Sequence, residues 1–167
     1  MRKTVEDRKN EYIAALTTAR QELLAAADAV PPEAYDTPCI GVWSIKDLLA
    51  HLIGWDETNR NAVQEILRGE RPAFFQYYDK DWQTYNASLV RRHRREPLSA
   101  LLADLEASHQ RLLDDLQSLS ARQVLEGKSP PEKGRPVTIR RLLRAEAADE
   151  RKHAAQVQAF VARLRGE

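Results

Sequence analysis

The segment EAADERKHAAQV, residues 146–157, places ionisable side chains where a helix of a globular protein is normally apolar. Apolar residues on both sides of it recur at helical spacing, and the same stripe passes through Glu146, Glu150 and His153. Asp149 lies one turn before His153, so the two side chains share one side of the helix, with Cβ atoms about 5–6 Å apart. Because an unpaired buried carboxylate is costly, we expect these groups to have partners: a basic side chain, water or a metal ion.

A further ionisable residue, His51, lies within the apolar run WSIKDLLAHLIGWD, residues 43–56. A lone histidine in such a run is usually a core residue that is hydrogen-bonded to a neighbour. Together with Asp149 and His153 on another helix, however, it makes a set of two imidazoles and one carboxylate, and helix bundles assemble metal sites from facing helices in this way. Three protein ligands would leave a position for water or substrate. The residues alone leave the core histidine and the metal site both open.

A divalent ion lowers the pKa of a bound water or thiol and so produces a nucleophile at neutral pH. With such an ion present, Glu150 or Glu146 would orient a ligand or act as the base. The alternative role for both glutamates is a salt bridge with an arginine of the same helix, for which the candidates are Arg140, Arg144 and Arg151. Four aromatic residues are candidates for the wall of a substrate cavity, with simple core or lid packing as the alternative: Trp55, Tyr78, Trp82 and Tyr85.

A rival metal hypothesis comes from two E-x-x-H motifs, Glu106 with His109 and Glu150 with His153. Di-iron bundles use two such motifs on different helices, together with one further glutamate from each of the other two helices. The nearest candidates for those two positions are Glu22 and Glu57, and neither fits well into an apolar stripe. The pattern therefore favours the three-ligand site.

Apolar periodicity predicts long helices at about residues 3–28, 45–69, 97–119 and 138–164, and a short helix at 81–94. No segment alternates apolar and polar residues for long enough to indicate a strand. The expected fold is an all-α four-helix bundle with a long crossover connection between the second and third long helices. The length suits a single domain over residues 1–167.

Composition argues against several classes of partner. The net charge is +1, from 26 basic and 25 acidic residues, so no broad single-sign field favours nucleic acid or a membrane surface. The basic run RRHRRE, residues 91–96, is short and has no interleaved aromatic residues, which is typical of a solvated helix end. No segment approaches the apolar length of a membrane span or a signal peptide, and the single cysteine fits a reducing compartment. We expect a cytoplasmic protein.

Two runs resemble the DinB-like superfamily of bacterial four-helix bundles: residues 43–56, WSIKDLLAHLIGWD, and residues 149–157, DERKHAAQV. The order of the helices and the long crossover also fit. The resemblance implies a divalent metal held by three histidines, one on the second helix and an H-x-x-x-H pair on the last. By position these ligands correspond to His51, Asp149 and His153, so the first histidine of the pair is replaced by a carboxylate.

This replacement bears on the choice of metal. A carboxylate ligates zinc, nickel, manganese or iron, and it shifts the preference of a site away from soft metals. Two histidines with one carboxylate are also the ligand set of some non-haem iron enzymes. The identity of the expected divalent cofactor therefore stays open among these four metals.

The colibactin self-protection branch of the superfamily resembles the chain through its middle as well, in GERPAFFQYYDKDWQTYN and LLADLEASHQRLL. That branch opens an electrophilic cyclopropane and does not keep the metal histidines. Other relatives transfer a low-molecular-weight thiol or isomerise maleylpyruvate. The resemblance thus implies a metal-dependent enzyme that acts on a small electrophile by thiol transfer or hydrolysis. The alternative is a non-catalytic bundle that binds or sequesters a small molecule without metal. Relatives often form homodimers, which we expect here as well.

Overall fold

The computed structural model describes residues 3–77, 81–132 and 134–166. The helical segments follow one another as α1 (Val5–Asp28), η1 (Pro32–Ala34), α2 (Ile45–Leu67), η2 (Ala73–Tyr77), α3 (Trp82–His93), α4 (Leu98–Ser118), α5 (Ala121–Glu126) and α6 (Ile139–Arg165). Over these residues the only β-type pairings are isolated bridges in connecting segments. The all-α class predicted from the sequence is confirmed.

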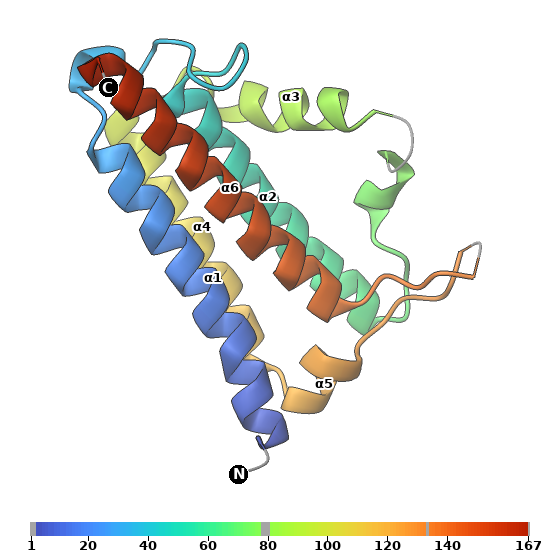
Figure 1. Cartoon of the computed structure of the whole chain (residues 1–167). Coiled ribbons are helices and arrows are strands. Elements are labelled where there is room, and N and C mark those ends of the chain that lie inside the picture. The colour runs from blue at the N-terminus through green and yellow to red at the C-terminus, as the bar shows by residue number, and fades with distance from the viewer. Residues whose placement is uncertain (1–2, 78–80, 133, 167) are drawn as a thin grey trace.

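Four long helices, α1, α2, α4 and α6, form the bundle (Figure 1). In this view α6 lies between α1 and α2, and α1 packs along α6 while α2 packs along α4. α2 and α4 run in the same direction, so the chain between them must return along the bundle. The segment 68–97 makes this return through η2 and α3, which confirms the predicted crossover. The short helix α5 lies in a stretch where the sequence indicated no helix.

The two helices that carry the candidate ligands begin at side-chain caps. Ser44 and Asp47 form a reciprocal capping box at the start of α2. Thr138 accepts a hydrogen bond from the backbone N–H of Arg141 at the start of α6. α6 ends at Gly166, whose φ of 76° is a left-handed conformation that glycine adopts without strain. These caps fix where each helix starts, and hence which side chains face inward.

Helix α3 lies directly on α2 because Gly54 has no side chain. A Cβ at this position would come within 2.7 Å of the Cβ of Leu89 on α3, which is closer than packed carbon atoms approach. The close contact holds the crossover against α2. As a result, the first turns of α3, with Trp82 and Asn86, cover the side of α2 that carries the candidate site.

Candidate metal centre and cavity

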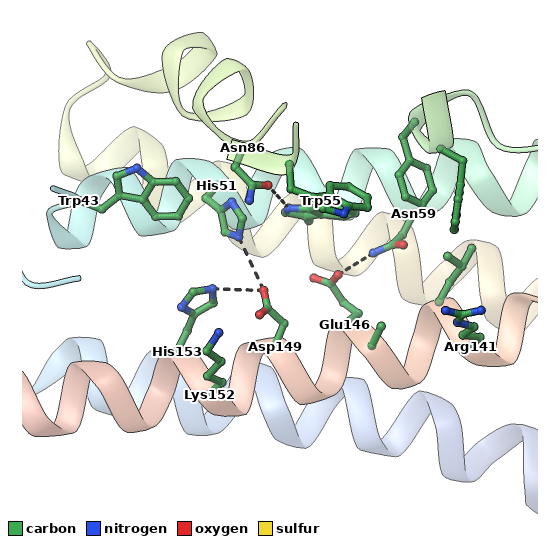
Figure 2. Close-up of a pocket in the computed structure, with 15 residues that line it drawn as sticks. Trp43, His51, Trp55, Asn59, Asn86, Arg141, Glu146, Asp149, Lys152 and His153 are labelled. Atoms are coloured by element: carbon green, nitrogen blue, oxygen red, sulfur yellow. Dashed lines mark hydrogen bonds and ion pairs between the residues drawn. The ribbon is translucent and has the colours of Figure 1, made fainter. Parts of the chain in front are cut away.

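The structure brings the three predicted metal ligands together from two helices. His51 comes from α2, and Asp149 and His153 come from α6 (Figure 2). Oδ2 of Asp149 lies 3.2 Å from Nε2 of His153 and 3.7 Å from Nε2 of His51. One ligand atom from each residue lies within 4.8 Å of the other two. This spacing is compact enough for all three groups to reach a single ion.

The pKa shifts of His51 and Asp149 suit the binding of a divalent cation. His51 is 2% exposed and neither ring nitrogen has a hydrogen-bond partner, because its contact with Asp149 is longer than a hydrogen bond. Burial lowers the pKa of His51, as does nearby His153, so its imidazole is neutral and keeps a free lone pair. Burial opposes ionisation of Asp149, but its contacts with His153 and His51 outweigh burial and hold the Asp149 pKa below its usual range.

His153 is oriented by a neighbour on its own helix. Its Nδ1 lies 2.8 Å from Oε1 of Gln156, one turn further along α6. With Nδ1 held by this amide oxygen, Nε2 faces Asp149 and is the ring nitrogen that a metal ion could reach. Metal-binding histidines are commonly held in this way. Two imidazoles and one carboxylate are therefore a donor set that fits a divalent ion. The strongest indication of a metal site is His51, because its imidazole is buried and makes no hydrogen bond.

The three candidate ligands lie at the wall of a cavity of about 410 Å³ between α2, α3 and α6. Of the four aromatic residues predicted to wall a cavity, Trp55 and Trp82 line it. Tyr85 is not a lining residue: its ring packs behind Trp55 at a centroid distance of 5.6 Å, and its hydroxyl group bonds to that of Thr58. Tyr78 lies outside the described residues.

Several lining residues were not predicted from the sequence: Trp43, Asn59, Phe74, Phe75, Asn86, Arg141 and Lys152. One signal was available for Asn59, which follows His51 by eight residues on α2 and so lies on the same face of that helix. Asn86 could not have been found this way, because it comes from α3 in the crossover. Its side-chain oxygen accepts a hydrogen bond of 3.0 Å from the indole N–H of Trp55.

Glu146, predicted as a catalytic candidate, lines the cavity near the three ligands. Its carboxyl group is buried and accepts a hydrogen bond of 2.7 Å from the side-chain amide of Asn59 (Figure 2). Burial raises the pKa of Glu146 well above its ordinary value, and the nearby carboxylates of Glu150 and Asp56 raise it further. A protonated carboxyl group in this place can donate a proton or a hydrogen bond to a ligand.

Glu150, the other catalytic candidate, is not among the lining residues of the cavity. It is fully buried, and its two carboxylate oxygens accept hydrogen bonds of 2.8 and 3.0 Å from the guanidinium group of Arg20 on α1. The same guanidinium group bonds to both oxygens of Asp56 on α2. Glu150 thus forms a salt bridge, which the sequence indicated as the alternative to a catalytic role. Its partner is an arginine of α1 and not one of α6.

The other groupings of histidines and carboxylates are less suited to a metal. Asp56, His109 and Glu150 lie close together, but the Arg20 guanidinium already supplies the positive charge there. The di-iron hypothesis finds no geometric support, because its glutamates Glu22 and Glu106 are exposed on the surface. A third group, His93 with Glu96 and Asp104, lies in partly exposed positions, and His93 already bonds to Glu96 at 3.0 Å.

We expect Glu146→Gln to stabilise the protein more at pH 8 than at pH 5. Folding raises the pKa of Glu146, so the carboxyl group ionises at a lower pH in the unfolded chain than in the folded protein. The stability that the protonated Glu146 contributes is therefore fully present below the unfolded-state pKa and is lost as the pH rises through the folded-state pKa. Glutamine mimics the protonated form and can keep the hydrogen bond from Asn59. Thermal melting of both proteins should show a gain of about 1 kcal/mol at pH 8 and a smaller gain at pH 5. An equal effect at both pH values would show that Glu146 is ionised in the folded state.

Comparison with known proteins identifies both a family and a structural neighbour. The family model described as the DinB superfamily matches residues 15–157. The crystal structure of the colibactin self-resistance protein ClbS, solved in complex with a double-stranded DNA, has the same fold: the TM-score is 0.76 and the identity is 20%, over 91% of this chain and 94% of that chain. No curated protein matches the sequence.

One expectation about partners requires correction. The near-neutral net charge was taken to exclude nucleic acid, but a protein of the same fold has been solved bound to double-stranded DNA. Net charge alone was the wrong criterion, because it says nothing about how the charges are distributed over the surface. As for membranes, no helix among the described residues is both long and apolar enough to span one.

Proposed function

The chain belongs to the DinB superfamily, and from this premise we propose that it is a divalent-metal-dependent enzyme acting on a small electrophilic molecule, by thiol transfer or hydrolysis. The observation that carries the proposal is the convergence of His51, Asp149 and His153 at the wall of the cavity. In this proposal these three side chains hold the ion. A bound divalent ion would lower the pKa of a water or thiol ligand and stabilise developing negative charge.

The cavity residues would position the electrophile beside the three ligands. Aromatic rings from η2, α2 and α3 form an apolar wall that favours a flat or unsaturated molecule. Glu146, held by Asn59, would donate a proton to the atom that becomes negative as the electrophile reacts. Asn86, fixed by Trp55, would offer its amide N–H to a polar substituent. The metal is open among zinc, nickel, manganese and iron.

Metal analysis of the purified protein tests this proposal. We expect about one divalent ion per chain in the wild type and almost none in His51→Ala or His153→Ala. His93→Ala serves as a control, because His93 is a partly exposed histidine on α3 that bonds to Glu96. A chelator should also lower the melting temperature of the wild type. Equal metal contents in all four proteins would contradict the proposal and leave the alternative, a metal-free bundle that binds or sequesters a small molecule.

Two further expectations remain proposals. The single cysteine, Cys39, is consistent with a cytoplasmic location. The formation of a homodimer stays a prediction from the resemblance, and light scattering on the purified protein would test it.

A further inference from the structure

The outward face of α6 carries charge of one sign. The helix contains seven basic and three acidic residues. Two of the acids, Glu146 and Glu150, are buried, and the third, Asp149, contacts the two histidines of the candidate metal centre. The basic side chains are at least partly exposed, and we call them the α6 basic stripe: Arg140, Arg141, Arg144, Arg151, Lys152, Arg163 and Arg165. The near-zero net charge of the chain therefore conceals a local excess of positive charge.

The remainder of this face is small and neutral. The exposed residues between the two ends of the stripe include Ala148, Ala155, Gln158 and Ala159. The large apolar side chains of α6 are buried in the bundle, except for Leu164 near its end. A helix that lies in a membrane interface inserts an exposed apolar face, which α6 does not have. Its outward face is better suited to a rigid polyanion.

A groove of about 350 Å³ runs between α1 and α6 beside the stripe. Arg8 from α1 and Arg144 and Arg151 from α6 line it, against a single lining carboxylate, Glu11. Three guanidinium groups around one groove make a setting that favours phosphate, which arginine binds through paired N–H donors.

Nearby contacts leave most of this positive charge available. The guanidinium group of Arg144 lies over the ring of Tyr12, 5.5 Å from its centroid, which holds the arginine in place without neutralising it. Arg151 pairs with Glu22 at 3.5 Å, but both side chains are about half exposed, so this ion pair is weak and a phosphate can compete with it. Glu11 pairs with Lys3.

We propose that the α6 basic stripe and the α1–α6 groove bind the phosphate backbone of duplex DNA. The stripe extends from Arg140 to Arg165, which is about 37 Å at a rise of 1.5 Å per residue. This length is close to one helical turn of B-DNA, roughly 34–36 Å. The α1–α6 groove shares no lining residue with the cavity of the proposed metal centre, whereas Arg141 and Lys152 at the edge of the stripe line that cavity as well. The contacts with DNA would be electrostatic and independent of base sequence.

Fluorescence anisotropy with a labelled duplex of 20 base pairs tests the proposal. We expect the wild type to bind, with log K falling linearly as log salt concentration rises. The variant Arg8→Gln/Arg144→Gln/Arg151→Gln should bind on the order of 100-fold more weakly at 0.1 M salt, with a salt slope shallower by about three. Circular dichroism should show an unchanged helical fold, because all three side chains are exposed.

The matched control is Arg91→Gln/Arg95→Gln/Arg122→Gln, which removes the same charge from exposed positions outside α6 and the groove. We expect this control to bind DNA nearly as well as the wild type. An equal loss in the control would overturn the proposal, as would a wild type that does not bind the duplex at 50 mM salt. Tighter binding to anionic lipid vesicles than to duplex at equal phosphate concentration would overturn it in favour of a membrane surface.

Discussion

Replacing Arg20 with alanine is expected to lower the free energy of unfolding by about 3–5 kcal/mol. Arg20 is 3% exposed and joins three helices: α1, which carries it, α2 through Asp56 and α6 through Glu150. Its removal leaves two carboxylates close together in the core without the guanidinium group between them, and only the imidazole of His109, 3.8 Å from Asp56, remains beside them as a basic group. Ser108, which donates a hydrogen bond of 2.6 Å to Asp56, cannot replace the lost charge.

Urea titration followed by circular dichroism would measure this loss. Arg60→Ala is the matched control: Arg60 pairs with Asp115 at 2.8 Å, but both side chains are about one-third exposed, so we expect a loss of at most about 1 kcal/mol. A triple variant, Arg20→Met with Asp56→Leu and Glu150→Leu, should recover much of the lost stability, because no buried charge then remains unpaired. An Arg20→Ala protein as stable as the control would show that water solvates the two carboxylates.

The helices of this fold follow closely from the sequence, because their signals are local. The apolar stripes and the caps at Ser44 and Thr138 predict where α2 and α6 begin, and the structure confirms both starts. The stripe also identified the ionisable residues of α6 that point inward, since inward orientation depends only on helical period. The crossover was predictable from the length of the segment between the second and third long helices.

Contacts between distant segments were not predictable from one sequence. Arg20 and Glu150 are 130 positions apart, and Arg20 lies in a helix where most other charged residues are exposed, so nothing local marks it as a core residue. For the same reason the partner of Glu150 was sought among the arginines of its own helix. The cavity wall depends on how α3 folds back over α2, so Asn86 and the phenylalanines of η2 were missed, while Trp55 on α2 was found.

The buried ion cluster and the candidate metal centre are linked through α6. Glu150 and Asp149 are consecutive residues, and their side chains diverge to opposite partners, Arg20 in the core and the two histidines at the cavity. A rotation of α6 that moved Asp149 away from His51 would also break the hydrogen bonds to Arg20. The Arg20 cluster therefore acts as a positioning element that holds the carboxylate of the proposed metal centre in register with α2.

Asp149→His is expected to change the metal preference of the proposed site. The substitution replaces an oxygen ligand with an imidazole and creates an H-x-x-x-H pair with His153 on one face of α6. Imidazole suits zinc and nickel, whereas carboxylate suits manganese, so the ratio of zinc affinity to manganese affinity should rise at least about 10-fold. The change also removes the carboxylate that contacts both His51 and His153.

Competition titrations with a chromophoric chelator would measure both affinities. Asp149→Asn is the matched control, because it keeps the shape of aspartate but loses the charge, and it should weaken binding of both metals without raising the ratio. If Asp149→His leaves the ratio unchanged, Asp149 is not a ligand, and its role is limited to its contacts with the two histidines.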